Sequence, residues 1–140
     1  MSRTTMGFIF TALAYLVIGT GLGAYMAIAP GGKALQPVHA HLNLVGFVMF
    51  TVFGIAYHIL PRFRGRPLHS EGMAWVQLWL ANAALVGFEL STVANIYWGV
   101  GGALRGVFGA ALALSFYLFV YNIGRTLLQP PPPPPQPIRR

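Results

Sequence analysis

Residues 40–60 read AHLNLVGFVMFTVFGIAYHIL and contain no acidic residue, lysine or arginine. A run of about twenty apolar residues is long enough to cross the hydrocarbon layer of a membrane as a helix. Residues 6–28, 73–95 and 100–128 are also predominantly apolar. Only helices suit such segments, because open strands would leave backbone groups without hydrogen-bond partners in lipid. The sequence therefore predicts an all-α fold, an integral membrane four-helix bundle formed by residues 1–128.

The composition indicates that lipid is the main solvent of the chain. Of the 140 residues, 56% are hydrophobic and 8% are charged, so charged side chains are too few to cover a water-soluble domain. The net charge is +7, but the basic residues gather between the apolar segments. Membrane topology explains that pattern, and we expect no nucleic acid partner. The sequence has no cysteine, which excludes thiolate metal sites and covalent haem attachment.

The ends of the four segments predict the topology. Helix-stopping residues separate the segments, namely Pro30, Gly31, Gly32 and Pro37, then Pro61 to Pro67, then Gly99, Gly101 and Gly102. Lys33 and Arg105 fall on one side of the four-span arrangement. The other basic residues fall on the opposite side: Arg3, Arg62, Arg64, Arg66, Arg125, Arg139 and Arg140. The positive-inside rule therefore predicts a multi-pass protein of the cell inner (cytoplasmic) membrane with both termini in the cytoplasm.

Residues 129–140 are rich in proline and predict a cytoplasmic tail that extends as polyproline II. Two interpretations of this tail remain open. It can serve only to stop the last helix, or it can dock a partner that binds proline-rich segments.

Two histidines, His39 and His41, stand at the outer end of the second predicted span. An imidazole buried in lipid without a partner is costly. Residues two apart on a helix point about 200° from each other, so these two imidazoles cannot easily share one metal ion and would face two separate clefts. They are either structural, capping the helix or bonding to loop carbonyls, or ligands of two metal centres.

The stretch from His39 to Pro61 resembles the tenth transmembrane helix of haem-copper oxidase subunit I. That helix carries a His-x-His pair followed by phenylalanine, glycine, histidine and proline at set distances. In this chain His41 is followed without a gap by the matching residues Phe50, Gly54, His58 and Pro61. The resemblance covers a minor part of the chain.

In that family the first histidine of the pair ligates the high-spin haem and the second ligates the low-spin haem. The resemblance thus implies haem b bound by His39 and His41. It also implies that the chain is similar to one four-helix arc of the family's twelve-helix fold. A homotrimer would rebuild the full ring with a haem cleft at each subunit junction. The implied function is that of a membrane b-type haem protein, in electron transfer with a redox partner or in binding oxygen or nitric oxide.

The sequence also departs from the family. The copper site of the family needs a histidine on the sixth helix, usually with a nearby tyrosine, and a further His-His pair, and this sequence has no match to them. We therefore expect no copper and not a complete oxidase, and whether the chain is an enzyme stays open.

Four further residues are candidates for the site. Glu89 is the only acidic residue within a predicted span, and Arg105 lies at a matching depth, which predicts an ion pair between them. In the alternative, Arg105 holds haem propionates and Glu89 handles protons or orients a ligand. Met26 is a conceivable axial ligand or a core methionine. His58 lies about 25 Å along the helix from His41 and is interpreted as structural.

Two other functions remain as alternatives. The first is a non-enzymatic membrane scaffold or assembly factor, in which the histidines are structural and the proline tail recruits a partner. The second is a small transporter that uses Glu89 and Arg105, although four spans leave little room for a pathway within one subunit.

Overall fold

The computed structural model describes residues 1–130, and all of the regular structure in this part of the chain is helical. The predicted all-α class is confirmed for these residues. The helical segments long and apolar enough to cross a membrane are four: Arg3–Ile28, Gly32–Phe63, Glu71–Trp98 and Gly102–Leu128. They match the predicted spans to within about three residues at each end, except that the second begins at Gly32 and not near residue 40. The chain thus has the character of a multi-pass membrane protein.

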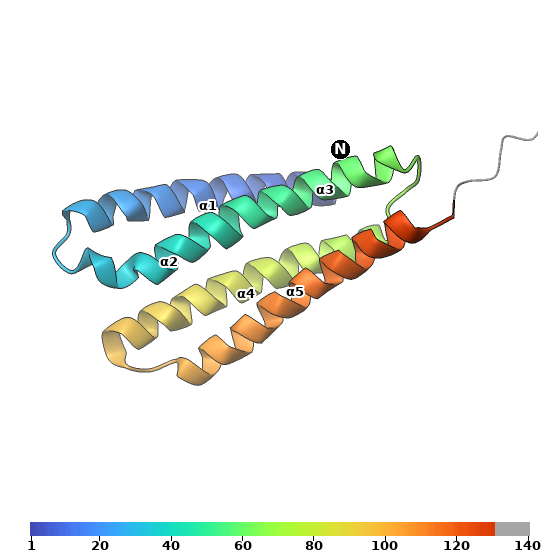
Figure 1. Ribbon diagram of the computed structural model, residues 1–140. Helices are drawn as coiled ribbons and strands as arrows, with labels where there is room; N and C mark the ends of the chain where they lie inside the picture. The colour runs from blue at the N-terminus through green and yellow to red at the C-terminus, as the bar shows by residue number, and fades with distance from the viewer. Residues whose placement is uncertain (131–140) are drawn as a thin grey trace, which may run out of the picture.

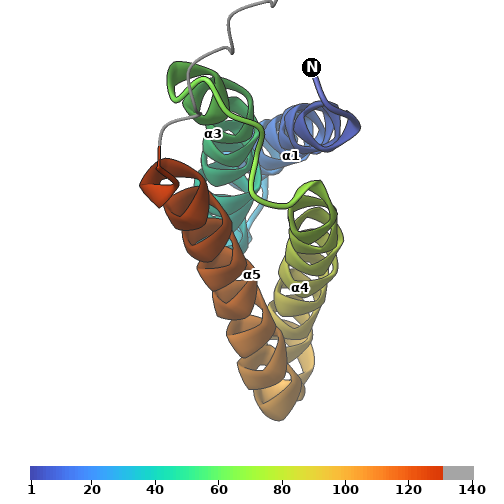
Figure 2. The same ribbon diagram turned by 90° about the vertical axis from the view of Figure 1, so that its right-hand side faces the viewer.

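The helices form two hairpins that pack side by side (Figure 1). The first hairpin pairs α1 (Arg3–Ile28) with α2 (Gln36–His41), η2 (Leu42–Met49) and α3 (Phe50–Phe63). The second pairs α4 (Glu71–Trp98) with α5 (Gly102–Leu128). Viewed from one end, α1, α3, α5 and α4 stand at the corners of a four-helix bundle (Figure 2).

The turn between α4 and α5 depends on glycine. Gly99 has φ of 68° and Gly101 has φ of 93°, in the left-handed region that other residues rarely adopt. Gly99 ends α4 as its C-cap, and Gly101 is the N-cap of α5. The predicted break at this glycine cluster is confirmed, and it makes the two helices antiparallel neighbours.

The second span is continuous but irregular. It begins with the short 3₁₀ helix η1 (Gly32–Leu35), passes through α2, becomes the π-helix η2 and ends as α3. Pro37 and Pro61 were expected to break the chain, but both lie inside helices. Pro37 is in the first turn of α2, where a missing N–H costs nothing. Pro61 is in the last turn of α3, so few helical bonds follow it.

The core of the bundle is aromatic. Phe8 of α1 packs edge-on against Phe50 and Phe53, with ring centroids 5.5 Å and 5.8 Å apart. Phe53 in turn contacts Phe116 and Phe119 of α5. Such pairs stabilise beyond the burial of their area, by about 0.5–1.5 kcal/mol each. The cluster therefore joins α1, α3 and α5.

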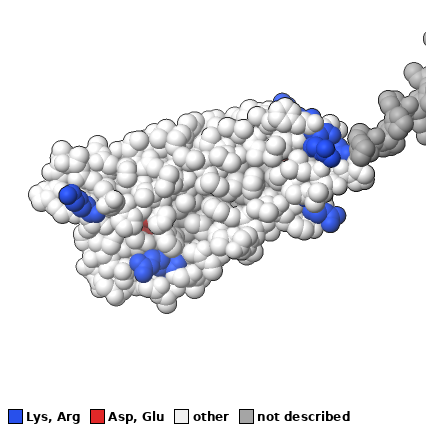
Figure 3. Space-filling model, in the orientation of Figure 1, with Lys and Arg blue, Asp and Glu red and all other residues white. Residues whose placement is uncertain are grey.

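The charged side chains gather toward the two ends of the bundle and leave its middle almost free of charge (Figure 3). The larger group is at the end where α1 starts and α3 and α5 finish. Which end faces the cytoplasm stays a prediction. Helix α5 ends at Leu128 and Gln129 is extended, where the proline tail was predicted to begin. Most of that predicted tail, residues 131–140, lies outside the described residues.

A polar clamp closes the end of the bundle at which α5 finishes. The Asn122 side chain accepts a hydrogen bond from the Ser70 N–H at 3.0 Å and donates one to the Ser70 carbonyl at 2.8 Å. The hydroxyl of Thr126, one turn later on α5, accepts a bond from the His69 N–H at 3.0 Å. Ser70 is also the N-cap of α4, so the clamp holds the start of α4 against the end of α5.

We predict that Asn122→Leu lowers the free energy of unfolding by about 1–3 kcal/mol, because it leaves two backbone groups of Ser70 unpaired. Thermal unfolding of purified protein in detergent measures the change. Ser115→Ala is the control, since the Ser115 hydroxyl is equally buried but bonds only to a carbonyl of its own helix. Equal losses in the two variants would contradict the role of the clamp.

Candidate functional site

His39 lies on α2 and its imidazole faces α1. Its Nδ1 is 2.9 Å from the carbonyl oxygen of Gly19. Because a carbonyl can only accept, Nδ1 carries the proton and donates it, and Nε2 keeps its lone pair. The side chain of Asn43, one turn further along, donates to the His39 carbonyl at 2.8 Å. The ring is therefore held in one orientation and one tautomer.

Two glycines of α1 make room for this contact. A Cβ atom added at Gly23 would lie 2.7 Å from Cε1 of His39, and one at Gly19 would lie 2.7 Å from Nδ2 of Asn43. Real Cβ atoms do not approach that closely, so a larger residue at either position would force the facing side chain or α1 to shift. The pair of glycines four residues apart is thus used for helix packing within the chain.

His41 faces a different helix, α4. Its Nδ1 lies 3.2 Å from Oε1 of Glu89, and its ring is nearly perpendicular to that of Phe88, with 5.1 Å between the ring centroids. The His41 side chain is 39% exposed, whereas that of Glu89 is only 8% exposed. The predicted separation of the two imidazoles is confirmed, because His39 contacts α1 and His41 contacts α4.

The contact between His41 and Glu89 is close but is not a well-formed hydrogen bond. Within residues 1–130, Nδ1 of His41 and both carboxylate oxygens of Glu89 lack a hydrogen-bond partner of good geometry. A buried carboxylate without such partners is costly. The imidazole is the only charged or chargeable side chain within ion-pair distance of Glu89 in the described part of the chain. Glu89 therefore lies on the Nδ1 side of the His41 ring, and Nε2 is on the opposite side of the ring from this contact.

Within residues 1–130, the Nε2 atoms of His39 and His41 are alike in having no hydrogen-bond partner. Among the described residues, neither Nε2 atom takes part in a hydrogen bond, and neither is an enclosed polar atom. Nδ1 held by an oxygen acceptor, with Nε2 free, is the arrangement that metal-ligating histidines usually have. No group of three or more His, Asp or Glu side chains in residues 1–130 lies close enough to hold a metal ion. Each histidine therefore offers a single imidazole ligand.

The predicted ion pair between Glu89 and Arg105 is wrong. Within residues 1–130 Glu89 pairs with His41 and no arginine comes within ion-pair distance of it. The prediction used only the depth of the two residues in the membrane. Whether they meet depends also on the direction in which each side chain leaves its helix. Glu89 points into the bundle toward α2, and Arg105, in the first turn of α5, is half-buried without an ionic partner in these residues.

The remaining predicted residues lie away from the two histidines or in the core. Met26 is half-buried at the end of α1 and packs against the hydrophobic core, as a core methionine would. His58, on α3, lines a pocket at the opposite end of the bundle.

Sequence reasoning missed three contributors to the site: Gly19, Asn43 and Phe88. Asn43 follows His39 by one helical turn and was visible in the sequence as its neighbour on the same face. The Gly19 carbonyl and the Phe88 ring come from other helices. No pattern in the sequence marks them as neighbours of the histidines.

Comparison with models of protein families, with curated proteins and with solved structures gives no match to this chain. The resemblance to haem-copper oxidase subunit I, including its four-helix arc, therefore stays a prediction.

We predict that Gly23→Ala lowers the thermal stability of the protein, by about 1–3 kcal/mol, because the added methyl group forces the His39 ring and α1 apart. Gly21→Ala is the matched control on the same helix, where an added Cβ meets nothing within 4 Å. The control should melt at or above the wild-type temperature, since alanine favours a helix more than glycine does. If the two variants melt alike in detergent, the close approach at Gly23 is not required.

Proposed function

We propose that the chain is a membrane b-type haem protein in which Nε2 of His39 and Nε2 of His41 each ligate haem iron. The observation that supports this function is the shared state of the two imidazoles, with Nδ1 against an oxygen acceptor and Nε2 without a partner. Neutral imidazole in a fixed orientation is a common axial ligand of haem. A bound haem would supply reversible electron transfer or, at an open axial position, binding of oxygen or nitric oxide.

A purely structural role explains at most one nitrogen of each ring. The Gly19 carbonyl accepts a hydrogen bond from Nδ1 of His39, whereas Glu89 lies 3.2 Å from Nδ1 of His41 without a well-formed hydrogen bond. An unpaired ring nitrogen within an apolar span remains unfavourable, because lipid offers it no hydrogen bond. Ligation of Nε2 removes this cost. Coordination therefore explains the pair more fully than packing does.

The opposite directions of the two rings favour an oligomer. One subunit offers one imidazole to each of two haems, so a haem with two histidine ligands would need its second ligand from another subunit. The homotrimer implied by the resemblance to subunit I would supply it. Only 6% of an apolar stretch of α5 is buried within the chain, which leaves that helix for lipid or for neighbouring subunits. Arg105, without an ionic partner in residues 1–130, is available for a haem propionate.

We predict that protein purified after expression with ample haem shows a Soret band that His41→Ala and His39→Ala each abolish or shift. His69→Ala is the control, because His69 lies in the loop before α4 and contacts Tyr121 instead of the candidate site. Absorption spectra of oxidised, reduced and carbon-monoxide-treated samples measure haem content and show whether an axial position is open. A colourless wild-type protein would overturn the proposal and favour the scaffold or assembly factor.

We also predict that Glu89→Leu weakens haem binding about 10–100-fold, the usual effect of removing the acceptor that orients a ligating histidine. Glu89→Gln keeps an oxygen that can accept from Nδ1 of His41, so its loss should be smaller. Titration of the haem-free protein with haem measures both affinities. Wild-type affinity in Glu89→Leu would show that the carboxylate does not orient His41.

A further inference from the structure

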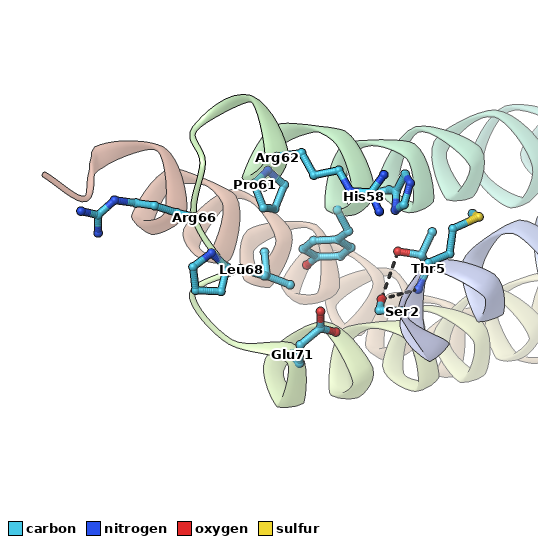
Figure 4. A pocket seen from close by; sticks show the side chains of 11 residues that line it. Ser2, Thr5, His58, Pro61, Arg62, Arg66, Leu68 and Glu71 are labelled. Atoms are coloured by element: carbon cyan, nitrogen blue, oxygen red, sulfur yellow. Dashed lines mark hydrogen bonds between the residues drawn. The ribbon is translucent and has the colours of Figure 1, made fainter. Parts of the chain in front are cut away.

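A second polar site lies at the end of the bundle opposite His39 and His41. The start of α1, the end of α3, the loop after it and the first residue of α4 enclose a pocket of about 280 Å³ (Figure 4). The haem proposal does not use this pocket. It stands at the end where most arginines gather, which is the level of the membrane surface if the four helices cross a bilayer.

Opposite charges line two walls of the pocket. Glu71, the first residue of α4, directs its carboxylate into the space, and Thr4 donates a hydrogen bond to it at 3.3 Å (Figure 4). Arg62, in the last turn of α3, lies beside His58 on the other wall (Figure 4). The Arg66 guanidinium points away from the pocket.

These opposite charges do not neutralise each other. Glu71 and Arg62 line one cavity, yet they form no ion pair, since the only ion pair within residues 1–130 is that of His41 with Glu89. Arg3 lines a neighbouring groove on the other side of Glu71, together with Trp75, and it forms no ion pair either. A carboxylate and a guanidinium across one cavity are complementary to a ligand that carries an ammonium and an acidic group close together.

The uncharged residues that line the pocket offer a ligand few free hydrogen-bonding groups. The Tyr57 hydroxyl already bonds to Gln77, and the Ser2 hydroxyl already bonds within the first turn of α1. Pro61, Pro67 and Leu68 supply apolar walls. Met1 and His58 line the pocket as well, and the charges of Arg62 and of the Met1 amino group both act on His58. Glu71 is the only carboxylate in the lining, beside apolar surface that suits the glycerol end of a lipid.

We propose that this pocket binds the phosphoethanolamine group of a membrane lipid. Glu71 accepts hydrogen bonds from the primary ammonium, and Arg62 pairs with the phosphate. A choline headgroup cannot donate a hydrogen bond to Glu71, because its trimethylated nitrogen has no N–H. A glycerol headgroup fails there as well, because it has no positive charge. The pocket should therefore select phosphatidylethanolamine over lipids that share only its phosphate.

The test is native mass spectrometry of the full chain in detergent with one lipid at a time. Phosphatidylethanolamine, phosphatidylcholine and phosphatidylglycerol with identical acyl chains are compared at equal concentration. We expect wild-type protein to retain phosphatidylethanolamine at least several-fold more than the other two. Glu71→Gln keeps an acceptor for Thr4 and should remove this preference, whereas Arg62→Gln should lower retention of all three.

Arg64→Gln is the matched control, because Arg64 is an exposed arginine just after α3 that does not line the pocket. In a second set of measurements, soluble glycerophosphoethanolamine replaces the lipid. If it binds as tightly as the lipid, the ligand is a free metabolite, and the assignment to lipid is overturned. Equal retention of the three lipids by wild-type protein, or an unchanged preference in Glu71→Gln, would overturn the site itself.

Discussion

A polar group that faces lipid has no water to bond with, and each such group left unpaired costs several kcal/mol. The described part of the chain meets this constraint mainly by turning polar side chains inward and pairing them across helices. Tyr15 bonds to Asn82, Tyr57 bonds to Gln77, and Asn122 bonds to the backbone of Ser70. Serine and threonine hydroxyls mostly bond to carbonyls of their own helices, as those of Thr11, Thr51 and Ser91 do.

Against this background the unpaired groups are informative. Among the described residues, the buried side-chain atoms without a hydrogen-bond partner belong to His41 and Glu89 at one end of the bundle and to Arg66 and Gln77 toward the other. At one end, the Glu89 carboxylate is buried beside His41, and two imidazole Nε2 atoms lack partners. At the other end, Glu71 and Arg62 line a pocket without forming an ion pair. Most polar groups of the bundle have hydrogen-bond partners. A bound ligand that pairs with the remaining ones is therefore the simplest explanation for them. The two proposals share this reasoning but involve different residues and can fail separately.

The irregular second span brings the first of these places together. The turn at Gly31 and the 3₁₀ helix η1 bring the chain back along α1, and the π-helix η2 follows directly after His41. A π-helix has more residues per turn than an α-helix, so it changes the direction in which later side chains point. The spacing from His41 to Phe50 matches the resembled family in number of residues. In this chain most of that spacing is the π-helix η2.

The sequence alone was enough to identify the helical membrane character, the approximate spans and the glycine turn after α4. These depend on composition and on local backbone preference. It also indicated that His39 and His41 point apart, because two neighbours on one helix are related by its pitch. Only the tertiary structure decided that Glu89 meets His41 instead of Arg105, that the Gly19 carbonyl holds His39, and that Glu71 and Arg62 share a pocket. Each of those contacts joins different helices, and the packing angle and rotation of one helix against another cannot be obtained from spacing along a single chain segment.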